Sequence, residues 1–239
     1  MKQLLLGELI IDVVHKDIKN IHLSVYPPNG KVRIAAPLRM DLDTVRVYAI
    51  SKLDWIRKQK EKFINQDREA PREYLNRESH YFRGKRYLLQ ICETNTASRV
   101  ELMHSRIILY ARSNAAPEKL QGILETWYRA ELKVLVAELI EKWEKILQVS
   151  VEEFGVKKMK TKWGTCNPEA RRIWINLELV KKPPECLEYI VVHEMVHLLE
   201  RNHNDHFIAY MDQFLPNWRS LKELLNKLPV KQESWQYLN

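Results

Sequence analysis

The stretch that decides the fold of the C-terminal half is Val191-Val192-His193-Glu194-Met195-Val196-His197-Leu198-Leu199. It is apolar apart from two histidines and one glutamate. The prolines at 183 and 184 predict the start of a helix that runs to about Glu200. Residues four apart lie on the same helical face, so both imidazoles would reach one ion. An apolar helix rarely carries such groups side by side unless they have a partner, so the pattern predicts a metal site.

The glutamate between the two histidines indicates which chemistry the metal site would support. Zinc favours imidazole nitrogen, and a catalytic zinc site keeps one position open for water. Glu194 directly follows the first histidine, where its carboxylate can take a proton from the attacking water and pass it to the leaving amine. The motif therefore predicts zinc-dependent hydrolysis with Glu194 as general base.

A third protein ligand is needed, and three residues are candidates. Glu200 lies about one turn beyond His197 on the same expected helix, so its side chain would run beside the ligands. His203 falls in an expected break at residues 202–205, where the chain can turn back toward the metal. His206 lies near the start of the next helix. His203 is favoured, and His206 is the alternative.

Further motifs carry a resemblance to a known family. Trp163-Gly164-Thr165-Cys166, Ile175-Asn176-Leu177 and Asn202-His203-x-x-x-Phe207 resemble the YgjP-like metal-dependent hydrolases, relatives of the SprT-like zinc peptidases. Ile21 to Val25, with the proline-rich turn that follows, extends the similarity to about residues 21–226.

The resemblance implies a zincin-type fold in the C-terminal half and a metallopeptidase activity on a peptide or protein substrate. It also implies one zinc ion held by His193, His197 and His203, with Glu194 as catalytic base. Thr165 stands where the family usually has serine. His206 occupies a position that the family does not use as a ligand.

Periodicity predicts an α+β protein, and together with the resemblance it implies a β-rich N-terminal part packed on a zincin-like C-terminal part. The chain has 239 residues, of which 45% are hydrophobic and 29% charged, which is typical of a globular protein. We expect a β-rich subdomain with one helix over residues 1–115 and the metallopeptidase subdomain over 116–239. The boundary lies near Ser113 to Pro117 and has no flexible linker.

Most of the expected elements follow from alternating or helical periodicity. The expected strands and hairpins are Leu5–Val14, Ile21–Tyr26 with a turn at Pro27–Gly30, Tyr81–Ile91, Val100–Tyr110, Val156–Trp163 and Arg172–Leu177. Residues 164–170 are expected to be a loop between the last two strands. The expected helices are Thr44–Asn65, a long one from Pro117 to about Gln148, one from about Asp205, and one from about Asn217 to Lys227.

Other residues near the motif have weaker signals. Cys166 and Cys186 are expected to be small buried residues and not nucleophiles. Tyr189 and Tyr210 are weak candidates for oxyanion donors. The segment Arg171–Leu177 is either an edge strand that binds peptide by backbone pairing or an ordinary core strand.

The charge balance leaves a second functional class open. The net charge is +8, with basic stretches at Arg57–Lys62 and Lys157–Lys162. A solvated surface is the favoured reading, and the alternative is a nucleic-acid-associated protein with a structural zinc site. A fourth ligand such as Cys166 or His206 would favour that alternative.

Features of the whole chain predict a cytoplasmic protein. The three cysteines form no CxxC pair, which fits a reducing compartment. The N-terminal apolar run ends at Glu8, too short for a signal peptide, and no stretch approaches the length of a membrane span.

Overall fold

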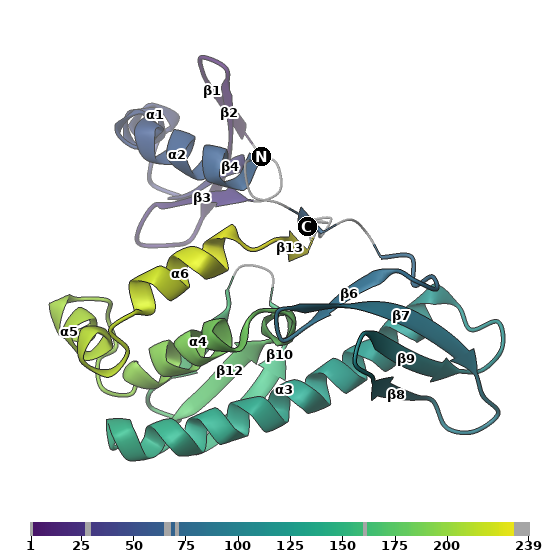
Figure 1. The fold of residues 1–239 in the computed structure, drawn as a ribbon. Helices are drawn as coiled ribbons and strands as arrows, with labels where there is room; N and C mark the ends of the chain where they lie inside the picture. The colour runs from purple at the N-terminus through teal and green to yellow at the C-terminus, as the bar shows by residue number, and fades with distance from the viewer. Residues whose placement is uncertain (1, 27–29, 65–67, 70–71, 160–161, 232–239) are drawn as a thin grey trace. The chain divides into compact units, whose positions relative to one another are not determined.

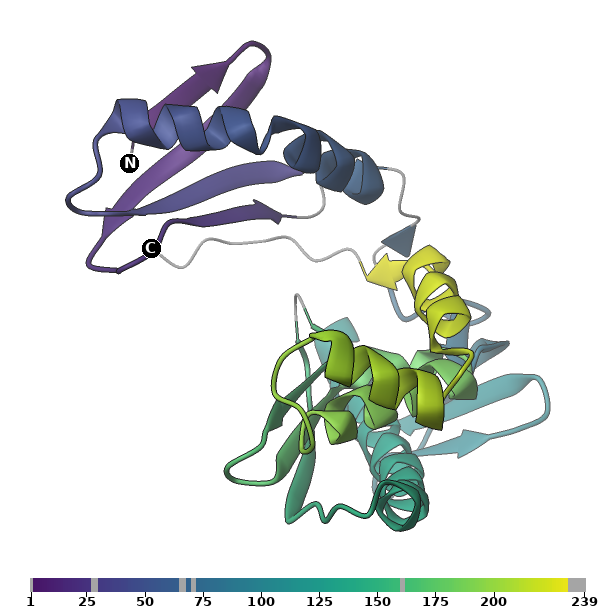
Figure 2. The ribbon, with the colours of Figure 1, turned by 90° about the vertical axis from the view of Figure 1, so that its left-hand side faces the viewer.

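The N-terminal unit, residues 1–69 together with 229–239, is built on a four-stranded sheet. The structure is a computed structural model, and it describes residues 2–26, 30–64, 68–69, 72–159 and 162–231. The sheet order is β1-β2-β4-β3, with strands β1 (Lys2–Leu6), β2 (Leu9–Lys16), β3 (His22–Tyr26) and β4 (Lys31–Pro37). Helices α1 (Leu42–Ser51) and α2 (Leu53–Ile64) lie along one face of this sheet (Figure 2). The aliphatic side chains between the helices and the sheet form the core of the unit.

Two predictions for this unit need correction. The expected strand Leu5–Val14 is a hairpin of β1 and β2, because Gly7 takes a φ of 61° and allows a tight turn. The expected single helix Thr44–Asn65 is divided at Lys52 into α1 and α2. There the Ser51 hydroxyl donates to the Tyr48 carbonyl at 2.8 Å, a local bond that competes with regular helical bonding.

The other N-terminal prediction is confirmed. Strands β3 and β4 are antiparallel, with Val25 opposite Val32, although the turn residues 27–29 lie outside the described part of the chain. The chain returns to this unit at its end, where β13 (Val230–Lys231) pairs in parallel with β5 (Arg68–Glu69).

The second unit, residues 70–228, contains two sheets joined by one long helix (Figure 1). The four-stranded sheet has the order β6-β7-β9-β8, with β6 (Ser79–Phe82), β7 (Lys85–Glu93), β8 (Arg99–Leu102) and β9 (Arg106–Ala111). Helix α3 (Pro117–Leu147) contacts β8 and β9 and also β10 of the second sheet. Both predicted hairpins and the long helix are confirmed.

This arrangement corrects the predicted boundary at residue 115. The β6–β9 sheet and α3 share one hydrophobic core, in which Leu89, Ile107 and Leu124 are buried together. The boundary near Ser113 to Pro117 therefore falls inside the second unit, and the two compact units divide near residue 69. The local composition of residues 113–117 does not indicate that the elements on either side of this turn pack into one core, so the sequence did not predict it.

The smaller sheet has the order β10-β12-β11, with β10 (Glu153–Lys157), β11 (Gly164–Asn167) and β12 (Arg172–Asn176). Residues 164–167 were expected to be loop, but they pair antiparallel with β12. Strand β12 is central and buries Ile173 and Ile175, so the prediction that it is an edge strand is wrong and the core-strand reading holds. The edge beside the histidine helix is β11, since α4 (Pro184–Val196) contacts β11.

Three further elements complete the second unit: the short helix η1 (Leu177–Lys181), α5 (Asp205–Phe214) and α6 (Trp218–Lys227). The α+β class is confirmed. No helix in the described ranges is long and apolar enough to cross a membrane.

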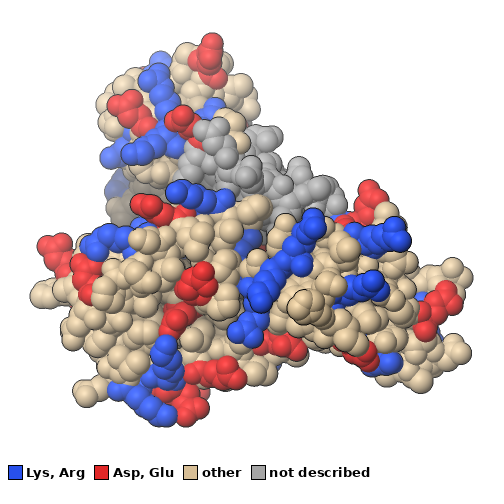
Figure 3. Space-filling view, in the orientation of Figure 1, with Lys and Arg blue, Asp and Glu red and all other residues tan. Residues whose placement is uncertain are grey.

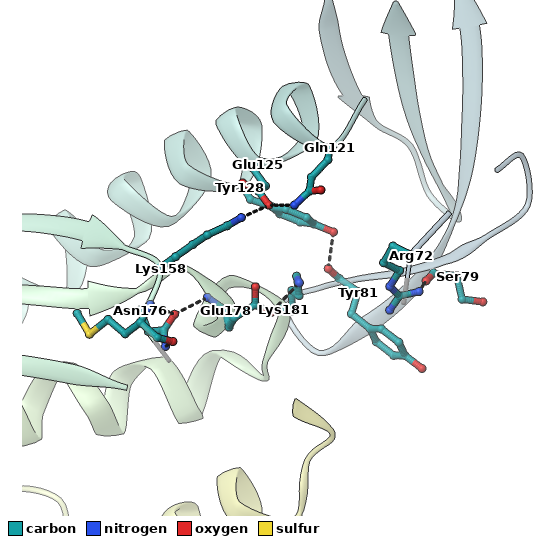
Figure 4. A network of polar contacts seen from close by, with 11 residues as sticks. Arg72, Ser79, Tyr81, Gln121, Glu125, Tyr128, Lys158, Asn176, Glu178 and Lys181 are labelled. Atoms are coloured by element: carbon teal, nitrogen blue, oxygen red, sulfur yellow. Dashed lines mark hydrogen bonds and ion pairs between the residues drawn. The ribbon is translucent and has the colours of Figure 1, made fainter. Parts of the chain in front are cut away.

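A polar network ties α3 to both sheets (Figure 4). The Tyr128 hydroxyl on α3 donates to the Tyr81 carbonyl on β6 at 2.8 Å. One turn earlier on α3, Glu125 pairs with Lys158, which follows β10. These contacts hold the segment after β10, which leads toward β11, against the long helix.

Candidate metal centre

Helix α4 carries the first two histidines. Two prolines open it, and most of its residues, from Cys186 to Val196, are buried. It ends at Val196 and not at Glu200 as expected, with His197 as its C-terminal cap residue. The early end lets the chain turn, and His203 comes back toward the helix.

The three histidines converge. The ligand atoms of His193, His197 and His203 all lie within 4.8 Å of one another, and the Nε2 atoms of His193 and His203 are 3.0 Å apart. Zinc–nitrogen bonds of about 2.0–2.1 Å in a tetrahedron place neighbouring nitrogens roughly 3.3 Å apart, so the spacing fits zinc. Among the residues that the structure describes, this is the group of potential metal ligands with that spacing.

The ring nitrogens also fit a metal. The Nδ1 of His197 lies 3.1 Å from the Glu200 carbonyl, which can only accept, so Nδ1 carries the hydrogen and Nε2 keeps its lone pair. Burial, with smaller effects from the neighbouring histidines and Lys222, lowers the pKa of His193 to about 3. His193 is therefore neutral near pH 7, as a metal ligand must be.

Phe207 supports all three imidazoles. Its ring centroid lies 5.0 Å from that of His193, 4.8 Å from that of His197 and 4.7 Å from that of His203. The side chain is 3% exposed. Its position follows from α5, where the Asn204 cap accepts a hydrogen bond from the Phe207 amide at 3.0 Å.

Glu194 lies beside the histidines with its carboxylate enclosed. The residue is 5% exposed, and burial raises its pKa to about 8, although Lys162 acts in the opposite direction. The backbone of β11 approaches closely at Gly164, where a Cβ atom would lie 2.6 Å from Glu194 Oε1. A side chain at position 164 would therefore displace this carboxylate, a role of Gly164 that the Trp163–Cys166 motif alone did not reveal.

A cavity of about 570 Å³ opens over these groups. It is lined by Lys162, Gly164, Thr165, Cys166, Asn167, Pro168, Glu169, His193, Glu194, His197, Arg201 and His203. Strand β11 thus forms one wall, and the metal-ligand candidates form the other. A substrate in this cavity would touch the triad, Glu194 and residues of β11 together.

The rival ligands lie elsewhere. The Glu200 carboxylate accepts a hydrogen bond from the Asn202 amide at 3.0 Å and so caps the turn after α4. Neither Glu200 nor His206 belongs to the converging group. Cys166 lines the cavity outside that group, and burial raises the pKa of its thiol to about 12, which leaves it protonated.

The remaining candidates are packing residues. Cys186 is fully buried. Tyr189 is 5% exposed, with its ring 6.0 Å from that of His193, and burial raises its pKa to about 12. Tyr210 stacks on Phe214 at 6.2 Å. Within the described chain, neither tyrosine lines the cavity, so the structure does not bring them to the site.

Asn176 is a buried residue whose role the sequence did not reveal. Its side-chain amide donates to the carbonyls of Met159 and Lys162 at 2.9 and 2.7 Å. Its side-chain oxygen accepts from the Glu178 amide at 3.2 Å (Figure 4), and its own backbone amide donates to the Trp163 carbonyl at 2.9 Å. These bonds fix the chain immediately before β11.

The basic stretch 157–162 is dispersed. Lys157 lies over the Trp174 ring at 3.5 Å, Lys158 pairs with Glu125, and Lys162 reaches the cavity, whereas residues 160–161 lie outside the described chain. On the face of the second unit shown in Figure 3, Lys and Arg are interspersed with Asp and Glu. Neither observation points to one continuous basic surface there.

Most of the chain is similar to a known family of proteins. A family model of the YgjP-like metallopeptidase domain matches residues 19–228. The chain belongs to the YgjP-like family. The resemblance seen in the sequence is thereby confirmed, and this YgjP-like protein is a metal-dependent, peptidase-like hydrolase.

Two solved structures of low similarity are metallopeptidase zymogens. Abylysin of Pyrococcus abyssi is 18% identical, with a TM-score of 0.36, over 38% of this chain and 90% of that chain. Jannalysin of Methanocaldococcus jannaschii is 20% identical, with a TM-score of 0.33, over 39% of this chain and 92% of that chain. No curated protein matches the chain.

Proposed function

We propose that this YgjP-like protein is a zinc metallopeptidase that cleaves peptide bonds. One zinc ion would be held by His193, His197 and His203. The observation that carries the proposal is the convergence of three imidazoles beside the buried carboxylate of Glu194 on the same helix. Zinc at such a site acts as a Lewis acid and lowers the pKa of bound water to about 7.

Within this proposal, the chain's own residues position and move the proton. Glu194 accepts the proton of the attacking water and returns it to the leaving amine. The absent side chain at Gly164 leaves the carboxylate room beside β11. Phe207 packs against all three imidazoles, and the Glu200 carbonyl orients that of His197.

The substrate is proposed to add to the free edge of β11. This strand is the outer strand of its sheet and lines the cavity. An extended peptide binds such an edge through main-chain hydrogen bonds. Antiparallel pairing is slightly more stable per residue than parallel pairing. In that orientation, the C-terminal side of the substrate lies beside Gly164 and the N-terminal side beside Asn167.

The alternative of a structural zinc site is less well supported. A structural zinc normally has four protein ligands, whereas a catalytic zinc has three and an open position. Three histidines converge in the described chain, and neither Cys166 nor His206 joins them.

The test is the variant Glu194→Gln. It should keep its zinc, measured by metal analysis, and the spectrum of the cobalt-substituted protein should show an unchanged ligand set. Hydrolysis of a peptide library should be lost. Glu185→Gln, an exposed residue in the first turn of the same helix, is the matched control and should remain active. If Glu194→Gln hydrolysed peptides as fast as the wild type, the assigned mechanism would be wrong.

A further inference from the structure

Lys162 stands at the end of the cavity where β11 begins. It lines the cavity, it is exposed, and its charge acts on the Glu194 carboxylate. We infer that Lys162 selects substrates that carry a carboxylate on the C-terminal side of the cleaved bond. The inference rests on the proposed peptidase function and on antiparallel pairing with β11, which directs that side of the substrate toward Lys162.

The backbone of Lys162 is held in place although its side chain is exposed. The Lys162 carbonyl accepts a hydrogen bond of 2.7 Å from the amide of Asn176, which is 4% exposed. The next carbonyl, that of Trp163, accepts from the Asn176 backbone at 2.9 Å. The backbone from which the Lys162 side chain extends is therefore fixed, two residues before the glycine that faces Glu194.

Lys162 also differs from the other described lysines of its stretch. Lys158 is paired with Glu125, and Lys157 lies over Trp174. Among the described residues, no carboxylate oxygen lies within ion-pair distance of the Lys162 ammonium. Since a lysine ammonium carries three donors, it can bind a substrate carboxylate without first breaking a contact of its own.

The other end of the cavity has a different charge balance. There Arg201 faces Glu169 at 3.9 Å, and both side chains are largely exposed, at 78% and 86%. One positive and one negative group give no net charge at that end. We therefore expect charge selection on the C-terminal side of the cleaved bond and little on the N-terminal side.

The size of the effect follows from what a single ion pair contributes. Exposed pairs are weak, and pairs in a partly closed cavity are stronger because fewer waters screen them. Changing the substrate group from glutamate to lysine replaces attraction by repulsion. We expect kcat/KM to fall about 10-fold for that exchange, mainly through KM.

The experiment uses the zinc-loaded full chain and quenched fluorescent peptides with amidated C-termini. The peptides differ at one position, which holds Glu, Gln or Lys, and the cleaved bond is located by mass spectrometry. Glu should be favoured over Lys about 10-fold on the C-terminal side, with less than about 2-fold preference on the N-terminal side. A parallel series of peptides has a free C-terminal carboxylate and no acidic side chain. It shows whether the carboxylate that Lys162 binds belongs to an acidic residue or to the end of the substrate chain.

Two variants test the assignment to one side chain. Lys162→Gln should abolish the preference for Glu, and Lys162→Glu should reverse it. Lys157→Gln removes a neighbouring charge that lies over Trp174 and should leave the preference intact. A preference that survives Lys162→Glu would overturn the inference.

A binding measurement separates this inference from the proposed function. Fluorescence anisotropy of labelled peptides with zinc-loaded Glu194→Gln does not require hydrolysis. Tighter binding of the Glu peptide, lost in Glu194→Gln/Lys162→Gln, would support Lys162 selection even if no peptide were cleaved. Cleavage with equal binding and equal rates for Glu, Gln and Lys peptides would leave the peptidase function standing and refute the selection.

Discussion

Glu194→Gln should make the zinc-free protein more stable than the wild type at alkaline pH, although the same change removes catalysis. Glu194 is 5% exposed, and burial raises its pKa from 4.5 to about 8. In the folded state the carboxyl group therefore holds its proton more tightly than in the unfolded chain. Its contribution to stability is complete below about pH 4.5 and is lost as the pH rises to about 8.

The magnitude follows from the width of that window. Each pKa unit corresponds to about 1.36 kcal/mol, and about three units separate pH 5 from the folded-state pKa. The wild type should lose about 4 kcal/mol of unfolding free energy between pH 5 and pH 9 through this group. Glutamine has a similar size and cannot ionise, so the variant should not show this loss.

The assay is urea unfolding in the presence of a chelator at about pH 5 and about pH 9, followed by tryptophan fluorescence. The quantity of interest is the difference in unfolding free energy between variant and wild type at each pH. Glu185→Gln, which changes an exposed carboxylate on the same helix, controls for the helix dipole. Zinc should reduce the pH effect, because a nearby cation favours the ionised carboxylate. An equal difference at both pH values would refute the claim that Glu194 is buried with a raised pKa.

Substitutions at three further positions test how the site is held together. Gly164→Ala places a Cβ atom 2.6 Å from Glu194 Oε1, so hydrolysis should fall roughly 100-fold while zinc affinity, measured by competition with a chromogenic chelator, stays unchanged. Phe207→Ala should lower the unfolding free energy by about 3–5 kcal/mol and weaken zinc binding as well, because the ring contacts all three imidazoles. Asn176→Ala leaves buried carbonyls without donors and should destabilise the second unit by at least about 2 kcal/mol in urea unfolding. Asn176→Asp keeps the acceptor oxygen but loses the donors, so it should be nearly as destabilising.

The parts of the site that depend on local periodicity were predictable from the sequence. The spacing of His193 and His197 specifies a shared helical face, and the prolines at 183 and 184 mark the start of that helix. A break was expected at residues 202–205, and His203 lies in the non-helical segment 197–204 between α4 and α5. In each case, the sequence pattern and the structural feature that it predicts involve residues within one or two helical turns of each other.

The parts that depend on long-range pairing were not predictable. Strand β11 has only four residues, with a glycine, a cysteine and an asparagine among them, and no alternation that would mark a strand. It is a strand because β12 pairs with it, and β12 is central because β10 pairs with its other edge. Likewise, residues 229–239 belong to the N-terminal unit, in which the last strand pairs with β5, a contact across more than half of the chain.

That long-range pairing gives β11 its place in the proposed mechanism. One short strand brings Gly164 against the Glu194 carboxylate, forms the outer strand of its sheet beside the cavity, and directly follows the segment in which Lys162 lines the cavity. All three features depend on the register of β11 with β12, in which Gly164 lies opposite Ile175, one residue before Asn176. Side chains alternate between the faces of a strand, so a shift of one residue would put Thr165 against Glu194 and move Lys162 away. The hydrogen bonds of Asn176 to Lys162 and Trp163 oppose that shift. Substrate selection by Lys162 and proton transfer by Glu194 should therefore fail together in variants that loosen this register, whereas Lys162→Gln should remove the selection without displacing Glu194, whose pKa should rise because the nearby Lys162 charge is gone.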